Sequence, residues 1–175
     1  MIDVATWRNL RFQALYVVLA LGIVSYRLLP LGAGGGGLAT PDLMVAITFA
    51  WALRHPAAVP MGLVVAVFLI SDFLLQRPPG LWAALVLLLT EALKTRRLAM
   101  AELNFAIEWA FVTGAVFAVI LAERMVLWVL FAPQTSLGLS LVVGLSTAAS
   151  YPFVVLVSQY LFGLRKLSPA DTEQL

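Results

Sequence analysis

The stretch LNFAIEWAFVTGAVFAVILA, residues 103–122, decides the fold class of this chain. It carries one ionisable side chain, that of Glu108, and as an α-helix it is long enough to cross a hydrocarbon core of about 30 Å. Because backbone groups in lipid must bond within their own segment, the stretch predicts a membrane-spanning helix. Runs such as LVLLL at 85–89 do not alternate apolar and polar residues, which argues against a transmembrane barrel.

The composition extends this interpretation to the whole chain. Apolar residues make up 62% of the 175 residues and charged residues only 11%, against about 25% charged in an ordinary soluble domain. The mean hydropathy is +0.99. A soluble domain of this size cannot bury so much apolar surface, because its surface-to-volume ratio is too high. We therefore expect lipid to be the solvent.

Six apolar segments predict an all-α integral membrane protein, a six-helix transmembrane bundle. The predicted spans are residues 12–29, 41–53, 57–75, 80–93, 103–122 and 137–163, within one domain at 1–166, followed by a polar cytoplasmic tail at 167–175. The first segment could instead be a signal peptide, but it is long for a signal core and similar runs follow it.

The lengths of the segments are uneven. Segments two and four make helices of about 20 Å, shorter than the hydrocarbon core. Either they extend into their flanks or they lie inside the bundle where the membrane is thin. Each is expected to start at a proline, whose missing N–H is harmless in the first helical turn. Segment five could continue past Glu123 and Arg124 through residues 125–131.

The basic residues predict the orientation of the spans. With the N-terminus in the cytoplasm, eight basic residues lie inside and three lie outside, the bias expected for cytoplasmic loops. Both termini are then cytoplasmic. The inside group is Arg8, Arg11, Arg54, Lys94, Arg96, Arg97, Arg165 and Lys166, and the outside group is Arg27, Arg77 and Arg124.

The sequence predicts no enzyme and no resident cofactor or metal. There is no cysteine, and the single histidine, His55, lies at a segment boundary, which leaves no Ser–His–Asp set and no multi-histidine metal site. No H-E-x-x-H motif and no P-loop occur. The basic residues stand in short clusters between apolar runs, a pattern of membrane topology and not of nucleic-acid binding. His55 is either a proton relay or a boundary residue at the level of the lipid head groups.

The few acidic residues near the spans are the first candidates for a functional role. Asp72 is either a buried carboxylate that pins a neighbouring helix or an interfacial acid paired with Arg77. Glu108 is expected to face the bundle, because a charged group in hydrocarbon costs at least about 2.5 kcal/mol. Glu91 precedes Lys94 by three residues, so the two should form a local ion pair.

The last segment contains the small-residue run GLSTAAS at 144–150, followed by Pro152. Small residues let helices approach closely, so the run is either a docking face for another membrane protein or a packing face within the bundle. Pro152 removes one backbone hydrogen bond and predicts a kink. Tryptophans and tyrosines near the segment ends are typical interfacial anchors.

Several short motifs resemble the rod shape-determining protein MreD family. They are PDLM at 41–44, which leads to WALRHP at 51–56, then MGL at 61–63 leading to ISDFL at 70–74, and finally YPF at 151–153 followed by Arg165 and Lys166. Their order and spacing cover nearly the whole chain.

The resemblance implies a non-enzymatic scaffold in the bacterial inner membrane, part of the cell-elongation complex that supports peptidoglycan synthesis and cell shape. The implied direct partner is MreC, a single-span protein. MreB, RodZ, RodA and penicillin-binding protein 2 (PBP2) are implied as members of the same complex. The implied fold resembles the S-components of energy-coupling-factor transporters, which makes a small-molecule binding or transport subunit the alternative function. The candidate partner-binding or helix-pinning residues are Pro41, Asp42, Trp51, Arg54, Asp72, Glu108 and Pro152.

Overall fold

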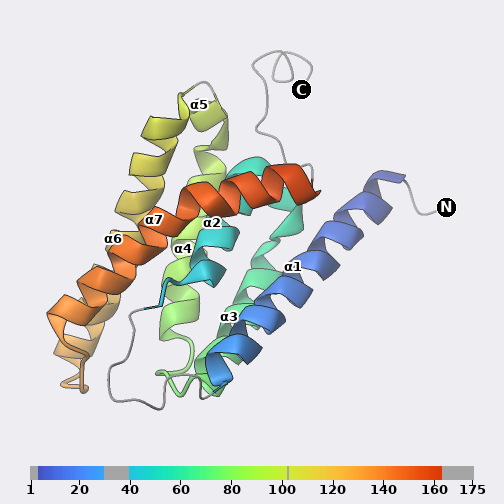
Figure 1. The fold of residues 1–175 in the computed structure, drawn as a ribbon. Coiled ribbons are helices and arrows are strands. Elements are labelled where there is room, and N and C mark those ends of the chain that lie inside the picture. The colour runs from blue at the N-terminus through green and yellow to red at the C-terminus, as the bar shows by residue number, and fades with distance from the viewer. Residues whose placement is uncertain (1–3, 30–39, 102, 163–175) are drawn as a thin grey trace.

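The computed structural model describes residues 4–29, 40–101 and 103–162 (Figure 1). Over these residues the chain contains seven α-helices, one 3-10 turn and no strand. In chain order they are α1 (Val4–Leu28), α2 (Leu43–Arg54), η1 (Pro56–Ala58), α3 (Met61–Leu74), α4 (Leu81–Thr95), α5 (Arg97–Ala101), α6 (Phe105–Val129) and α7 (Leu137–Phe162). The predicted all-α class is confirmed, and each of the six apolar segments contains a helix.

Three of the helices are long and apolar enough to cross a membrane. They lie in α1 (Thr6–Leu28), α6 (Phe105–Val129) and α7 (Leu137–Tyr160). The helices α2 and α3 are apolar but shorter. Membrane-spanning character therefore holds for these three helices, and large apolar side chains on them point outward, for example Val18, Met125 and Phe153.

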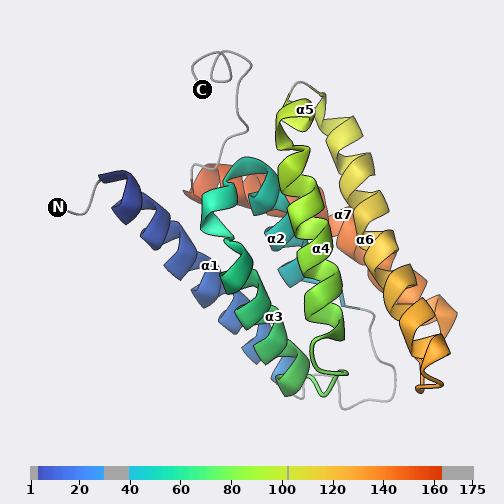
Figure 2. The same cartoon turned by 180° about the vertical axis from the view of Figure 1, so that it is seen from behind.

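The short helix α2 forms the centre of the molecule. Ten of its twelve residues are buried, which only a helix enclosed on all sides achieves. It packs against α4 and α7, while α1 packs on α3, α3 on α4, α4 on α6 and α6 on α7 (Figures 1 and 2). Of the two explanations for the short second segment, enclosure within the bundle is confirmed.

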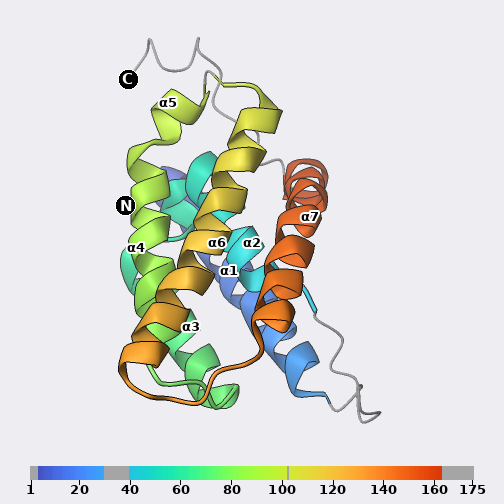
Figure 3. The same cartoon turned by 90° about the vertical axis from the view of Figure 1, so that its left-hand side faces the viewer.

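The main helices alternate in direction along the chain (Figure 1). The start of α1 and the end of α7 lie towards the end of the molecule that carries α5 (Figure 1). The α3–α4 and α6–α7 connections lie at the opposite end (Figures 1 and 3). The predicted tail at 167–175 and the basic residues Arg165 and Lys166 lie outside the described residues.

The expectation that segments two and four begin at a proline is wrong. The helix α2 begins at Leu43, after an N-cap at Asp42, whose side chain accepts a hydrogen bond from the Val45 N–H. The helix α4 begins at Leu81, after Gly80 with a positive φ of 86°. Free N–H groups of a first turn need acceptors, and a carboxylate supplies one. The prolines stand just before these caps.

The third predicted segment, 57–75, is not one continuous helix. A 3-10 turn covers its start, and α3 begins only at Met61, after Pro60 at the N-cap. Pro60 disfavours the helical conformation in the residue before it, so the chain breaks at Val59. The helix α1 is longer than predicted, because it starts at Val4. The expected continuation of segment five past Glu123 and Arg124 is confirmed as far as Val129, the last residue of α6.

The helix α7 bends along its length (Figures 1 and 3). Pro152 lies inside it, and a proline is the usual cause of such a bend. The small-residue run at 144–150 packs within the bundle. A Cβ added at Gly144 would lie 2.9 Å from Cε1 of Phe117 and 3.0 Å from Cδ1 of Ile120, both on α6. Gly144 thus lets α6 and α7 approach closely.

We predict that Gly144→Leu destabilises the α6–α7 contact. Overpacking of this kind costs about 1–3 kcal/mol, so the midpoint of thermal unfolding in lipid nanodiscs should fall. Gly138→Leu, on the same helix, is the matched control, because a Cβ at Gly138 meets nothing within 4 Å. Equal midpoints for the two variants would contradict the close approach at Gly144.

Candidate functional site

A buried ion pair links α2, α6 and α7 near the end of the molecule that carries α5. Nη2 of Arg54 lies 2.7 Å from Oε1 of Glu108, and each side chain is only 1% exposed. The Tyr151 hydroxyl donates to the same Glu108 oxygen at 2.8 Å and accepts from Nη1 of Arg54 at 3.2 Å. Each helix contributes one member, so this triad joins three helices at one point.

Local structure favours the charges of the pair where they are. Glu108 lies in the first turn of α6, behind an N-cap at Asn104, and Arg54 is the last residue of α2. A helix N-terminus favours a negative charge and a C-terminus a positive one, by about 0.3–1 kcal/mol each. The prediction that Glu108 faces the bundle is confirmed. Arg54 is buried with it and is not a surface cation of a cytoplasmic loop.

Further hydrogen bonds anchor α2 to its neighbours. The Trp51 indole donates from Nε1 to Oγ of Ser158 on α7 at 3.1 Å. The hydroxyls of Tyr16 on α1 and Thr48 on α2 lie 2.9 Å apart. Trp51 and Tyr16 are buried in the core, so the expectation of an interfacial anchor is wrong for both. A ring that is enclosed on all sides satisfies its polar atom with a neighbouring helix instead of head-group water.

At the opposite end of α2, Asp42 binds three partners. Its Oδ2 lies 3.3 Å from Nη1 of Arg27, its Oδ1 caps Val45 N–H, and its own N–H donates to Thr147 at 2.8 Å. The Pro41 carbonyl accepts from the same guanidinium at 3.1 Å. Pro41 and Asp42 therefore join α1, α2 and α7.

Asp72 pins the start of α4 from its position on α3. Its Oδ2 accepts hydrogen bonds from the backbone N–H groups of Gly80, at 3.0 Å, and Ala83, at 3.2 Å. The side chain is fully buried. Of the two interpretations of Asp72, helix pinning holds. Arg77 contacts it through the backbone, donating N–H to the Asp72 carbonyl at 2.9 Å.

Two smaller predictions also have outcomes. The local pair of Glu91 and Lys94 is confirmed, with Oε1 and Nζ 2.7 Å apart. His55 is half-buried and lies against Phe12, with ring centroids 4.7 Å apart. Burial lowers the pKa of His55 below its ordinary value, and the positive charge of Arg8 acts in the same direction.

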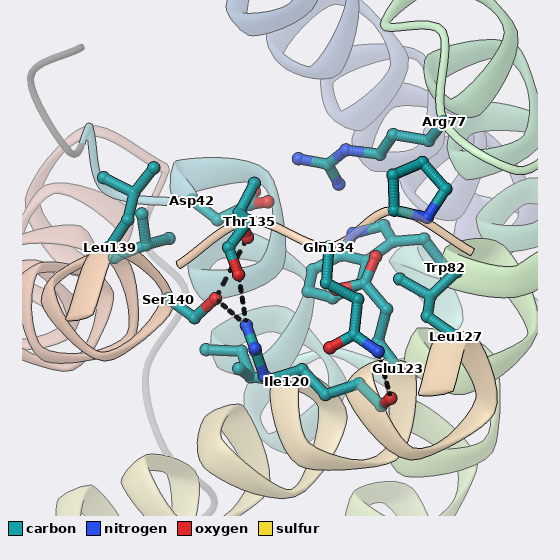
Figure 4. A pocket seen from close by; sticks show the side chains of 13 residues that line it. Asp42, Arg77, Trp82, Ile120, Glu123, Leu127, Gln134, Thr135, Leu139 and Ser140 are labelled. Atoms are coloured by element: carbon teal, nitrogen blue, oxygen red, sulfur yellow. Dashed lines mark hydrogen bonds between the residues drawn. The ribbon is translucent and has the colours of Figure 1, made fainter. Parts of the chain in front are cut away.

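A pocket of about 240 Å³ opens at the end of the molecule that holds the α3–α4 and α6–α7 connections (Figure 4). The start of α2, the α3–α4 turn, α4, α6 and the 133–135 segment all contribute to its wall. Arg77 reaches over it, with its guanidinium end directed towards the α6–α7 segment. Glu123 and Arg124, adjacent residues of α6, both line it.

The predicted site residues fall into three groups. One group lies at the C-terminal end of α2 and consists of Trp51, Arg54, Glu108 and Pro152, whose neighbour Tyr151 contacts the ion pair. The second group, Pro41 and Asp42, lies at the N-terminal end of α2. The third is Asp72, which binds the start of α4. Sequence reasoning missed the roles of Arg27 and Tyr151 and the pocket. A tyrosine in an apolar run beside a proline was the available signal for Tyr151. Among the described residues, no three His, Cys, Asp or Glu side chains lie close enough to hold a metal ion.

No protein-family model, curated protein or solved structure matches this chain. The resemblance to the MreD family therefore rests on the motifs quoted above. Four residues of those motifs, Asp42, Arg54, Asp72 and Tyr151, make the contacts that join the helices.

We predict that breaking the buried pair is strongly destabilising. Glu108→Gln or Arg54→Met leaves one charge buried alone and should cost about 3–5 kcal/mol. The double variant Arg54→Met/Glu108→Leu should cost less than the sum of the single variants, because no charge remains unpaired. Thermal unfolding in one lipid composition measures all of these.

Glu91→Gln is the matched control, because its ion pair has the same N–O distance of 2.7 Å but Glu91 is 40% exposed. It should change stability by about 0–1 kcal/mol. A Glu108→Gln effect no larger than that of Glu91→Gln would contradict the role given to the buried pair.

Proposed function

We propose that this chain is a six-span, non-enzymatic scaffold of the bacterial inner membrane that binds the single-span partner MreC within the cell-elongation complex. RodA, PBP2, RodZ and MreB are proposed as further members of that complex, and both termini are proposed to be cytoplasmic. The observation that carries the proposal is the use of the interior ionisable groups. Arg54, Glu108, Asp42 and Asp72 all hold helices to one another.

The arrangement supports a structural role over a catalytic one. Glu108 forms an ion pair with Arg54 and accepts a hydrogen bond from the Tyr151 hydroxyl. The side chains of Arg54 and Glu108 are both buried, so a substrate could not reach them. One carboxylate oxygen of Asp72 accepts hydrogen bonds from two backbone N–H groups. The MreD-like motifs contain Arg54, Asp72 and Tyr151, so the resemblance and the internal cross-links support the same proposal.

A groove on the outer surface of the described helices is suited to a partner helix. It runs between α4 and α6, has a volume of about 420 Å³ and is apolar. Ala92, Ala110, Gly114 and Ala118 line it and are exposed, and side chains this small allow close approach of a second helix. Arg96 lies at its α5 end with its guanidinium 5.7 Å from the centroid of the Phe111 ring. A partner helix of opposite charge at that end would complement it.

A second candidate function is a small-molecule binding subunit like an S-component. The pocket of about 240 Å³ beneath Arg77 favours it, since Arg77, Glu123 and Arg124 line it and it lies at one end of the helical bundle. Stabilisation of the isolated chain by a ligand would support this candidate, and association with a partner would support the first.

The six-span topology is tested by accessibility labelling. The chain has no native cysteine, so single-cysteine variants need no further change. In intact cells, Pro79→Cys and Pro133→Cys should react with a membrane-impermeant maleimide. Ala57→Cys and Thr95→Cys should react only after the membrane is opened. All four residues are exposed. Labelling of all four in intact cells would refute the topology.

Partner binding is tested by co-purification of MreC with the tagged chain in native lipid particles. Gly114→Leu should reduce the recovered partner at least tenfold, because it fills the α4–α6 groove. Gly62→Leu on α3 is the control, since a Cβ at either glycine meets nothing within 4 Å and both are exposed. Failure of the wild-type chain to associate would reject the proposed partner, and equal recovery with both variants would reject the groove.

A further inference from the structure

The pocket beneath Arg77 differs from the rest of the described interior in its charges. The ion pairs in the described part of the chain are Arg27–Asp42, Arg54–Glu108 and Lys94–Glu91. Arg77, Glu123 and Arg124 belong to none of them, yet all three line this one pocket. Charges of both signs therefore face the same space without a direct ion pair among the described residues.

The two guanidinium groups are held in place by neutral partners. Arg77 lies over the Trp82 ring, 5.0 Å from its centroid, which fixes the cation by a cation–π contact. Nη1 of Arg124 donates to the Thr135 carbonyl at 3.0 Å and to the Ser140 hydroxyl at 2.8 Å. These contacts orient both cations without a direct ion pair to a carboxylate of the described residues.

The distribution of basic residues along the chain points to the same place. At this end of the described bundle the basic residues are Arg27, Arg77 and Arg124. Arg77 and Arg124 line the pocket, and Arg27 binds Asp42, which also lines it. In the proposed topology these are the outside arginines, which run against the positive-inside bias. Their convergence on a single pocket gives a reason for their presence outside.

We propose that this pocket binds a small zwitterion that carries a phosphate group and a primary ammonium group, of the ethanolamine-phosphate class. Arginine pairs with phosphate through directed N–H donors, so Arg77 and Arg124 receive the phosphate. The free carboxylate of Glu123 receives the ammonium group. A volume of about 240 Å³ lies below the ~300–1,000 Å³ of drug-sized sites and fits a head group. The ligand source is either a lipid head group or a free phosphodiester.

The inference goes beyond the partner-binding proposal and does not depend on it. It gives the second candidate function a ligand class. The pocket lies at the end of the bundle opposite α5, whereas Arg96 of the α4–α6 groove lies next to α5. Ligand binding can therefore be measured on the isolated full chain without any partner protein.

The test uses the full chain in nanodiscs of phosphatidylcholine, with thermal unfolding as the readout. Glycerophosphoethanolamine should raise the unfolding midpoint of the wild-type chain. Glycerophosphocholine should do so less, because its trimethylated nitrogen cannot donate a hydrogen bond to Glu123. Glu123→Gln should make the two compounds raise the unfolding midpoint equally. Arg77→Gln should weaken the binding of both compounds at least tenfold. Arg96→Gln, at the other end of the bundle, is the matched control. It should leave the midpoint shift with each compound unchanged.

Two arms distinguish the sources. If a lipid is the ligand, phosphatidylethanolamine should remain bound in native mass spectra of the wild-type chain, be lost in Arg77→Gln, and block the effect of the soluble compound. If the free compound is the ligand, it should raise the unfolding midpoint equally in nanodiscs of phosphatidylcholine and in nanodiscs of phosphatidylethanolamine. No stabilisation by either compound or lipid, or equal loss in Arg77→Gln and Arg96→Gln, would overturn the proposal. Unchanged co-purification of MreC in Glu123→Gln and Arg77→Gln keeps the two proposals separate.

Discussion

The packing of the bundle depends on one buried contact, the ion pair between Arg54 and Glu108 under the hydroxyl of Tyr151. Two charges enclosed in apolar surroundings are tolerated only when they pair with each other in good geometry. This requirement fixes the end of α2 against the start of α6 and the middle of α7. Apolar contacts are not directional, so the ion pair also specifies how the three apolar helices are arranged.

Buried acidic side chains also bind the backbone N–H groups at the starts of two helices. Asp42 caps its own helix and holds Arg27, whereas Asp72 caps α4 from the neighbouring α3. In a mostly apolar environment the first N–H groups of a helix cannot rely on water, so a carboxylate from within the fold takes that place. Each of these rare acids thus does a structural task, and this is the physical basis for proposing a scaffold.

The pocket at the opposite end stands apart because its charges are oriented but unpaired. Arg77 is stacked on Trp82 and Arg124 is bonded to neutral oxygens, while Glu123 forms no ion pair in the described structure. The described structure therefore has a cross-linked interior and a recess lined by charged side chains, and the two proposals correspond to these two parts.

The sequence by itself determined that the six apolar segments contain helices, but not where each helix begins and ends. Backbone groups in lipid must bond within their own segment, so long apolar runs such as 103–122 can only be helical, and prolines and glycines mark the breaks. The local pair of Glu91 and Lys94 and the burial of Glu108 also followed from spacing and depth.

Only the tertiary structure decided that α2 is central, that Arg54 is the partner of Glu108, and that Arg77, Glu123 and Arg124 share a pocket. The physical reason is that lipid and protein core are both apolar. A helix in such a chain has no polar face that would reveal which side turns inward, and partners distant in sequence meet only once the helices pack.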